Sequence, residues 1–267
     1  MKNDYGLIKP FGPSIARAKM PEDLIINLNN HIEETISDKN KIEHFYVALN
    51  ADYTNKTLGE ISAQLAYNSL NYGYDALVIL NGQTITNRLI ENVLSFEGGY
   101  KNQLGPLAVQ ADLGLNIAGN LEGNYMDIKA DIQINEDIMA TAQLNINSTV
   151  ADYNYRLYQS NYLNYNWQNN FKNQYIQQIA VQLNSKKYGS LSADYSTINN
   201  FLYFEKKENL GVKPYQYSGT VNYARAKYEK EFKYNNFALH NTIMYQQVLE
   251  GNQVFNMPQL NTRNTLY

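Results

Sequence analysis

The residues of this 267-residue chain whose types suit catalysis are few, and they begin with three histidines. A Ser-His-Asp triad could form only through His44 or His240, and no Gly-x-Ser-x-Gly turn is present to expose a serine. There is no cysteine, which excludes thiolate nucleophiles, disulfides and thiolate zinc sites. Gly98-Gly99 lacks the spacing and the lysine of a phosphate-binding loop. We therefore expect no enzyme, with no catalytic residue, no metal and no cofactor.

A second set of candidates consists of charged and amide side chains that recur at every second position. Rings of such charges along a pore tune its selectivity for ions. The alternative interpretation is that these side chains are simply the solvated side of a sheet. The residues that we predict to face a lumen are Asp112, Asn116, Asp127, Lys129, Asp131, Gln133, Gln143, Asn145 and Asp194.

Alternation with a period of two would position these side chains, because successive residues of a β-strand point to opposite faces. Three consecutive segments alternate most clearly, and short polar stretches at 119–123 and 135–137 join them. Such a run is typical of an antiparallel meander. The apolar members are Leu107, Val109, Ala111, Leu113, Leu115 and Ile117, then Ile128, Ala130, Ile132 and Ile134, then Ile138, Ala140, Ala142, Leu144 and Ile146.

The same pattern continues less regularly on both sides of these segments. It recurs near 61–68, 175–183, 191–196, 217–223 and 237–245, with Gln177 as a polar exception on the apolar face. In the fourth of these, Tyr217, Val221 and Tyr223 are predicted to lie on the apolar face. Together with weaker candidates, the chain from Phe45 to Tyr267 contains roughly a dozen predicted strands.

One aliphatic and one polar face fit either a water-soluble sandwich or a membrane barrel. Aromatic residues crowd segments 153–175 and 201–217, and rings at strand ends form the girdles of a membrane barrel. The alternative is that tyrosine, present 24 times, simply follows strands. Connections 135–137 and 185–189 are short, whereas 147–161 and 199–214 are long. Short turns on one rim and long loops on the other favour the barrel.

Charge and hydropathy exclude two further classes of protein. A net charge of −3 and an isoelectric point near 5.7 argue against a nucleic-acid partner, which usually meets a clustered basic surface. No apolar run approaches 18 residues, so a transmembrane helix is excluded. A search for long apolar runs does not detect the strands of a membrane β-barrel, because apolar and polar residues alternate along them.

The first 44 residues follow a different pattern. Ile25, Leu28, Ile32 and Ile36 recur with helical spacing after Pro21, which predicts an amphipathic helix over about 22–38. Residues 3–6 are polar where a signal peptide would need an apolar core, so no signal peptide is visible. We expect an N-terminal arm and helix over 1–44 and a β-barrel region over 45–267.

Residues 93–267 resemble the putative porins of Bacteroidetes outer membranes. The resemblance rests on Ser95–Tyr100, Gln168–Phe171, Pro214–Tyr217, Asn256–Leu260 and Thr262–Tyr267. It implies an outer-membrane antiparallel barrel that passes small solutes. The first 44 residues match no part of that family, and the family normally continues with further strands.

Residues 6–26 weakly resemble the start of phage proteins related to the 2-oxoglutarate/iron oxygenases, in the stretches 6–16 and Met20–Asp23. Such enzymes hold iron with a His-x-Asp/Glu pair and a distant histidine. His31-Ile32-Glu33 matches that pair, but it falls on the predicted helix. In those enzymes the ligands lie on strands, so the polar face of a surface helix is the better explanation of this pair.

These observations predict a mainly β protein: an antiparallel up-and-down meander of a membrane β-barrel, in partial form, with a short N-terminal helix. The expected function is that of a porin-like outer-membrane barrel that contacts outer-membrane lipid and passes small hydrophilic solutes. We also expect a fragment or a fusion, because Tyr267 ends inside an apparent strand. The alternatives are a soluble or surface β-sandwich that binds a partner and a relative of the iron oxygenases.

Overall fold

The computed structural model describes residues 39–75, 78–80, 83–160, 162, 165–207 and 211–267. They belong to one compact unit, Asp38–Tyr267. The predicted helix over 22–38 and the pair His31 and Glu33 lie outside the described residues. The first strand begins at Asn40, five residues before the expected start of the β region at Phe45.

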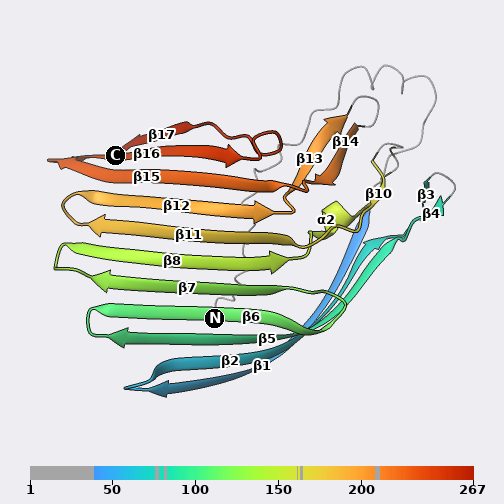
Figure 1. Ribbon diagram of the computed structural model, residues 1–267, viewed down its shortest axis with the longest axis horizontal. Helices are drawn as coiled ribbons and strands as arrows, with labels where there is room; N and C mark the ends of the chain where they lie inside the picture. The colour runs from blue at the N-terminus through green and yellow to red at the C-terminus, as the bar shows by residue number, and fades with distance from the viewer. Residues whose placement is uncertain (1–38, 76–77, 81–82, 161, 163–164, 208–210) are drawn as a thin grey trace. The chain divides into compact units, whose positions relative to one another are not determined.

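Eleven strands form one antiparallel sheet in which each strand pairs with the next one along the chain (Figure 1). This confirms the predicted meander. β1 and β17 are the two ends of the sheet and do not pair with each other, so the barrel is not closed. In sheet order the strands are β1 (Asn40–Asn55), β2 (Gly59–Tyr74), β5 (Arg88–Leu104), β6 (Leu107–Gly119), β7 (Asn124–Gln133), β8 (Ile138–Thr149), β11 (Gln174–Ser185), β12 (Gly189–Asn199), β15 (Thr220–Tyr234), β16 (Phe237–Glu250) and β17 (Leu260–Leu266).

The remaining elements lie in the connections between these strands. β3 (Ile79–Leu80) pairs with β4 (Gln83–Thr84), β9 (Leu157–Tyr158) with β10 (Trp167–Gln168), and β13 (Leu202–Lys207) with β14 (Gly211–Gln216). A single helical turn, α2 (Tyr153–Arg156), precedes β9. In the part of the chain that the structure describes, no helix is long and apolar enough to cross a membrane.

The two rims of the sheet differ in the length of their connections. Short turns at 56–58, 105–106, 134–137, 186–188 and 235–236 gather on the left of Figure 1. The long connections 75–87, 150–173, 200–219 and 251–259 lie at the opposite ends of the strands, together with the four-residue connection 120–123. This is the arrangement expected from the sequence, and we call the two sides the short-turn rim and the long-loop rim.

Asparagine shapes the turn between β7 and β8. The Oδ1 atom of Asn135 accepts hydrogen bonds from the backbone N–H groups of Asp137 and Ile138, both at 2.9 Å. Such a side-chain turn replaces a backbone turn and explains why asparagine suits this position. The turn reverses the chain within four residues, which keeps β7 and β8 adjacent.

The aliphatic face of the sheet is exposed rather than packed. Residues paired directly across antiparallel strands point to the same face, so the registers assign every strand position to one face. On the aliphatic face, Leu49 is 74%, Leu113 44% and Ile179 60% exposed. Among the described residues no second large sheet covers this face, so the sealed core of a β-sandwich is absent. A water-soluble protein rarely exposes so continuous an apolar surface.

Two sequence-based assignments of side chains are wrong. Val221 and Tyr223 pair with Ile198 and Ser196 and therefore lie on the polar face, where both are buried. The Tyr223 ring meets the edge of Phe255, at 5.7 Å between centroids, because the β16–β17 connection folds over them. These two residues were assigned to the aliphatic face because their side chains are apolar. Apolar side chains can also be buried on the polar face, where a connection folds over them.

Most of the crowded aromatic residues of segments 153–175 and 201–217 lie in the connections and do not form a girdle. Trp167 is stacked on Tyr158 at 4.8 Å between ring centroids, and Phe204 lies 4.8 Å from Tyr155. They pack against one another and join the long connections into a common apolar cluster. Exposed rings on the aliphatic face close to the short-turn rim include Tyr53, Tyr100, Tyr234 and Phe237.

Candidate functional site: the polar face of the sheet

All nine residues predicted to face a lumen lie on one face of the sheet, opposite the exposed aliphatic residues. Strand alternation and the registers of β6, β7, β8, β11 and β12 place them there. The structure brings eight of them together on β6, β7 and β8: Asp112, Asn116, Asp127, Lys129, Asp131, Gln133, Gln143 and Asn145. The ninth, Asp194, lies apart on β12.

Amide groups surround the carboxylate of Asp127. Its Oδ2 accepts hydrogen bonds from Gln143 Nε2 at 3.0 Å and from Asn145 Nδ2 at 3.1 Å. Asp131, four residues further along β7, pairs with Lys129 Nζ at 2.8 Å and accepts from the Thr141 hydroxyl at 2.5 Å. Both carboxylates therefore have polar or charged partners, as expected for a hydrated surface rather than for a packed apolar interior.

Two carboxylates are direct neighbours across β6 and β7. Asp112 pairs with Asp127 in the register, and both side chains are half-buried. Asp112 receives one hydrogen bond, from Gln110 Nε2 at 2.7 Å. Like charges directly opposite each other destabilise a sheet, and their repulsion is weak only in a medium of high dielectric constant. This pair is therefore compatible with contact to water and not with a dry core.

A hollow of about 250 Å³ lies beside Asp112 and reaches across β1, β2, β5, β6 and β7. Three carboxylates line it together with polar neutral groups, and neither lysine nor arginine is among the lining residues. At Gly99 the wall of the hollow is tightly packed, because an added Cβ would come within 2.4 Å of the Ser62 hydroxyl oxygen. The lining residues are Asn50, Asp52, Ser62, Ala63, Gln64, Glu97, Gly98, Gly99, Asp112 and Tyr125.

Tyr125 lies flat across a glycine to reach a carboxylate. Its hydroxyl donates to Glu97 Oε2 at 3.2 Å, and a Cβ at Gly114 would come within 2.2 Å of its ring. The residues pair in register as Glu97–Gly114 and Gly114–Tyr125. The sequence analysis missed Glu97 and Tyr125 as residues of this face. A glycine inside an alternating strand was the available signal, since it often marks a close approach.

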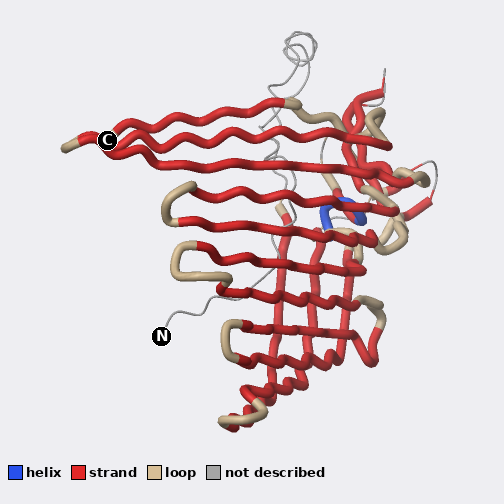
Figure 2. The backbone as a smooth tube through the Cα atoms, turned by 60° about the vertical axis from the view of Figure 1, so that its left-hand side comes forward, coloured by secondary structure: helices blue, strands red, loops and turns tan. Residues whose placement is uncertain are grey.

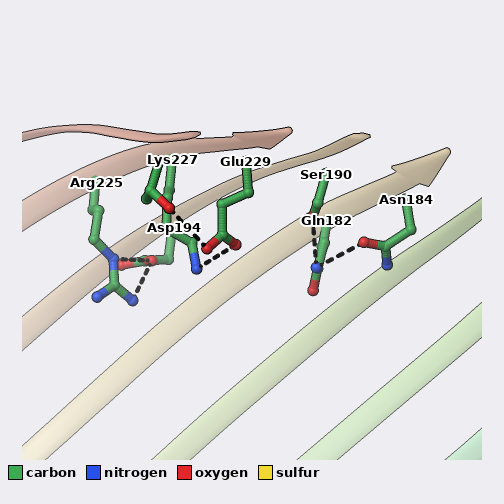
Figure 3. Close-up of polar contacts among 8 residues, drawn as sticks. Gln182, Asn184, Ser190, Asp194, Arg225, Lys227 and Glu229 are labelled. Atoms are coloured by element: carbon green, nitrogen blue, oxygen red, sulfur yellow. Dashed lines mark hydrogen bonds and ion pairs between the residues drawn. The ribbon is translucent and has the colours of Figure 1, made fainter. Parts of the chain in front are cut away.

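A second polar cluster occupies the same face on β11, β12, β15 and β16 (Figure 3). Arg225 donates from Nε to Asp194 Oδ1 at 2.7 Å, and the Asp194 side chain is only 8% exposed. Lys227 pairs with Glu229 at 2.8 Å, and Gln182 donates to Ser190 at 2.9 Å. Here cationic side chains and carboxylates alternate, whereas the only charged side chains that line the hollow beside Asp112 are carboxylates.

The histidines do not assemble a catalytic or metal site in the described part of the chain. His44 lies on β1, with Nε2 3.1 Å from the side-chain oxygen of Asn68. His240 lies on β16, opposite Glu231 and Thr265. No group of three or more histidine and carboxylate side chains within the described ranges is placed to hold a metal ion.

An exposed aliphatic face, a charged polar face and two unequal rims are the features of a wall of an outer-membrane β-barrel. Comparison with protein families agrees: residues 16–267 match the family of putative porins, and the chain belongs to this family. The match also includes most of the first 44 residues, which corrects the expectation that they match no part of the family. Nothing in the comparisons supports the likeness to iron oxygenases.

The fold resembles thirteen solved protein chains. One is the siderophore receptor PirA from Acinetobacter baumannii, with a TM-score of 0.65 and 7% sequence identity. The likeness covers 88% of this chain and 41% of the receptor chain, so it spans less than half of that protein. No curated protein sequence matches the chain. Family and fold together support a porin-like outer-membrane β-barrel.

Proposed function

We propose that the polar face of the sheet lines a water-filled path through the outer membrane for small hydrophilic solutes, and that the protein is not an enzyme. The observation that carries this proposal is the pair Asp112 and Asp127, two carboxylates side by side on a face whose opposite side is exposed and aliphatic. The aliphatic face would contact lipid. The nine predicted residues would then be lumen-facing.

The physical argument is the cost of burying polar groups. Unpaired polar atoms and charges are heavily penalised away from water, so a face with this many carboxylates, amides and hydroxyls must stay hydrated. Eight-stranded barrels are nearly filled by side chains, whereas sixteen strands leave an aqueous channel. A wall that already has eleven strands is wide enough to border such a channel.

The experiment is to reconstitute the protein in planar bilayers and record single-channel currents under a salt gradient. Carboxylates along the lumen should favour cations, so Asp112→Asn and Asp127→Asn should each shift the reversal potential toward anions. Glu136→Gln is the matched control, because it removes one negative charge from the exposed turn between β7 and β8. It should leave the reversal potential unchanged.

Two results would contradict the proposal. If protein that has inserted into the bilayer gives no conductance, there is no aqueous path through it. Conductance whose ion preference responds equally to Glu136→Gln and to Asp112→Asn would show that the polar face does not line that path.

A further inference from the structure

The connection between β8 and β11 does not take the direct route between its two strands. β8 and β11 are neighbours in the sheet, yet residues 153–158 contact β5 and β2, which lie three and four strands away from β8. Because neighbouring strands are 4.7–4.9 Å apart, the connection extends roughly 14–19 Å across the sheet. Figure 2 shows α2, the short helix of this connection, beside the strands at the long-loop rim.

An ion pair anchors this segment to β5. Arg156 in α2 pairs with Glu91, and both side chains are nearly buried, at 13% and 7% exposure. Glu91 is six residues from Glu97 on the same strand, so both point to the polar face. The segment is therefore folded onto the face that we propose to line the channel, and not onto the lipid side.

Aromatic contacts anchor the same segment to β2. The rings of Tyr72 and Tyr153 are 4.2 Å apart between centroids, and the Tyr72 hydroxyl donates to Asn154 Oδ1 at 3.3 Å. Tyr72 pairs with Leu89, two residues before Glu91, which places it on the polar face too. Leu157 and Tyr72 are almost completely buried in this contact. So much burial marks a packed element rather than a loop in solvent.

Other parts of the long connections also hold the segment. Trp167 donates from Nε1 to the backbone oxygen of Asn154 at 3.0 Å and stacks on Tyr158. Phe204 of the β13–β14 hairpin packs on Tyr155. With contacts to β2, to β5 and to a second connection, residues 153–158 have one defined position over the polar face.

We propose that residues 153–158 form a constriction that narrows the path at the long-loop rim and sets the largest solute that passes. This inference rests on the proposed function. The segment extends inward from the wall, so any solute that follows the polar face meets it. Its residues are three tyrosines, one asparagine, one leucine and one paired arginine, a surface that excludes by size while offering hydrogen bonds to polar solutes.

The first test releases the segment from its anchor. In Arg156→Gln the ion pair with Glu91 is lost, and the unit conductance should rise by roughly twofold because current grows with the open cross-section. Sugars too large for the unmodified protein should then enter liposomes. The matched control is Arg88→Gln, which removes another arginine–carboxylate pair at the same rim, with Asp75 at 3.2 Å, but does not anchor the segment. It should conduct like the unmodified protein.

A second pair of variants covers the case in which the single change fails to free the segment. Replacement of residues 153–158 by glycine and serine at equal length should widen the path fully. Conversely, Glu91→Cys with Arg156→Cys, bridged by a short bismaleimide, should keep the conductance low. The chain contains no cysteine, so this bridge can form at one place only.

Trp167 reports on the segment without any measurement of current. It is the only tryptophan, and it is 9% exposed, so release of the segment should shift its fluorescence emission to the red. A red shift with unchanged conductance would overturn the constriction and leave the proposed channel intact. No conductance from any variant, including the glycine–serine replacement, would overturn the channel itself. Conductance that opens only after the replacement would support the constriction in the form of a plug.

Discussion

Asp137 and Ser185 join two neighbouring turns at the short-turn rim. Asp137 precedes β8 and Ser185 ends β11, and the serine hydroxyl donates to Asp137 Oδ2 at 2.7 Å. The backbone N–H of Lys187 donates to the other carboxylate oxygen at 3.0 Å. One carboxylate therefore caps the β11–β12 turn from the preceding hairpin, and it fixes the register of β8 against β11 at their ends.

The first prediction concerns pH at this turn. The Ser185 hydroxyl, followed by the backbone N–H groups of Lys187 and Lys186, lowers the pKa of Asp137 below its ordinary value of 3.8. A lowered pKa means that the contribution to stability is complete above that ordinary value and is lost as the pH falls through the lower, folded pKa. We expect Ser185→Ala to raise the pKa of Asp137 in an NMR titration. An unchanged pKa would show that the hydroxyl does not bind the carboxylate.

The second prediction separates two glycines of the same sheet. A Cβ at Gly114 would come within 2.2 Å of the Tyr125 ring, whereas a Cβ at Gly98 would meet its nearest atoms at 3.7 Å. Gly114→Ala should therefore displace Tyr125 from Glu97 and destabilise the protein by about 1–3 kcal/mol. Gly98→Ala should stay within about 0.5 kcal/mol. Denaturant unfolding in lipid vesicles measures both, and equal effects would contradict the close packing at Gly114.

The alternation in the sequence was sufficient to predict the meander and the face of each of the nine polar residues. The predicted apolar positions from Leu107 to Ile146 fall on the observed β6, β7 and β8, with Ile134 in the turn that follows β7. The period of two is a property of the extended backbone, so it can be recognised in the sequence without knowing which strands pair with each other. The same reasoning placed Gln177 on the aliphatic face, where its amide donates to the Tyr175 hydroxyl at 2.9 Å.

Partners across strands and the path of the long connections could not be predicted in this way. The pairs Asp194–Arg225 and Glu91–Arg156 join residues 31 and 65 positions apart, and they depend on registers and loop folds that no local pattern specifies. Val221 and Tyr223 were misplaced for the same reason, since Phe255 covers them from a distant connection. Local period predicts the face, whereas tertiary packing decides what covers it.

The third prediction concerns the buried ion pair between β12 and β15. Arg225→Gln would leave the carboxylate of Asp194, 8% exposed, without its partner, and such a loss costs about 3–5 kcal/mol. The double variant Asp194→Asn with Arg225→Gln should recover much of that loss, which a double-mutant cycle measures. Lys227→Gln is the control, because Lys227 and Glu229 are partly exposed and such pairs contribute about 0–1 kcal/mol. Equal losses from Arg225→Gln and Lys227→Gln would contradict the difference in burial.

The last prediction tests which face meets lipid. Ile179 is 60% exposed on the aliphatic face of β11, and Gln178 beside it points to the polar face. In a water-soluble protein, Ile179→Lys at so exposed a position would change stability little. In a membrane barrel it should cost about 2–4 kcal/mol near the middle of the bilayer, while Gln178→Lys should be tolerated because a lysine in the lumen stays hydrated. The measurement is the free energy of unfolding from lipid vesicles. If Gln178→Lys is the more harmful of the two, the faces are assigned the wrong way round and the polar face is not the lumen.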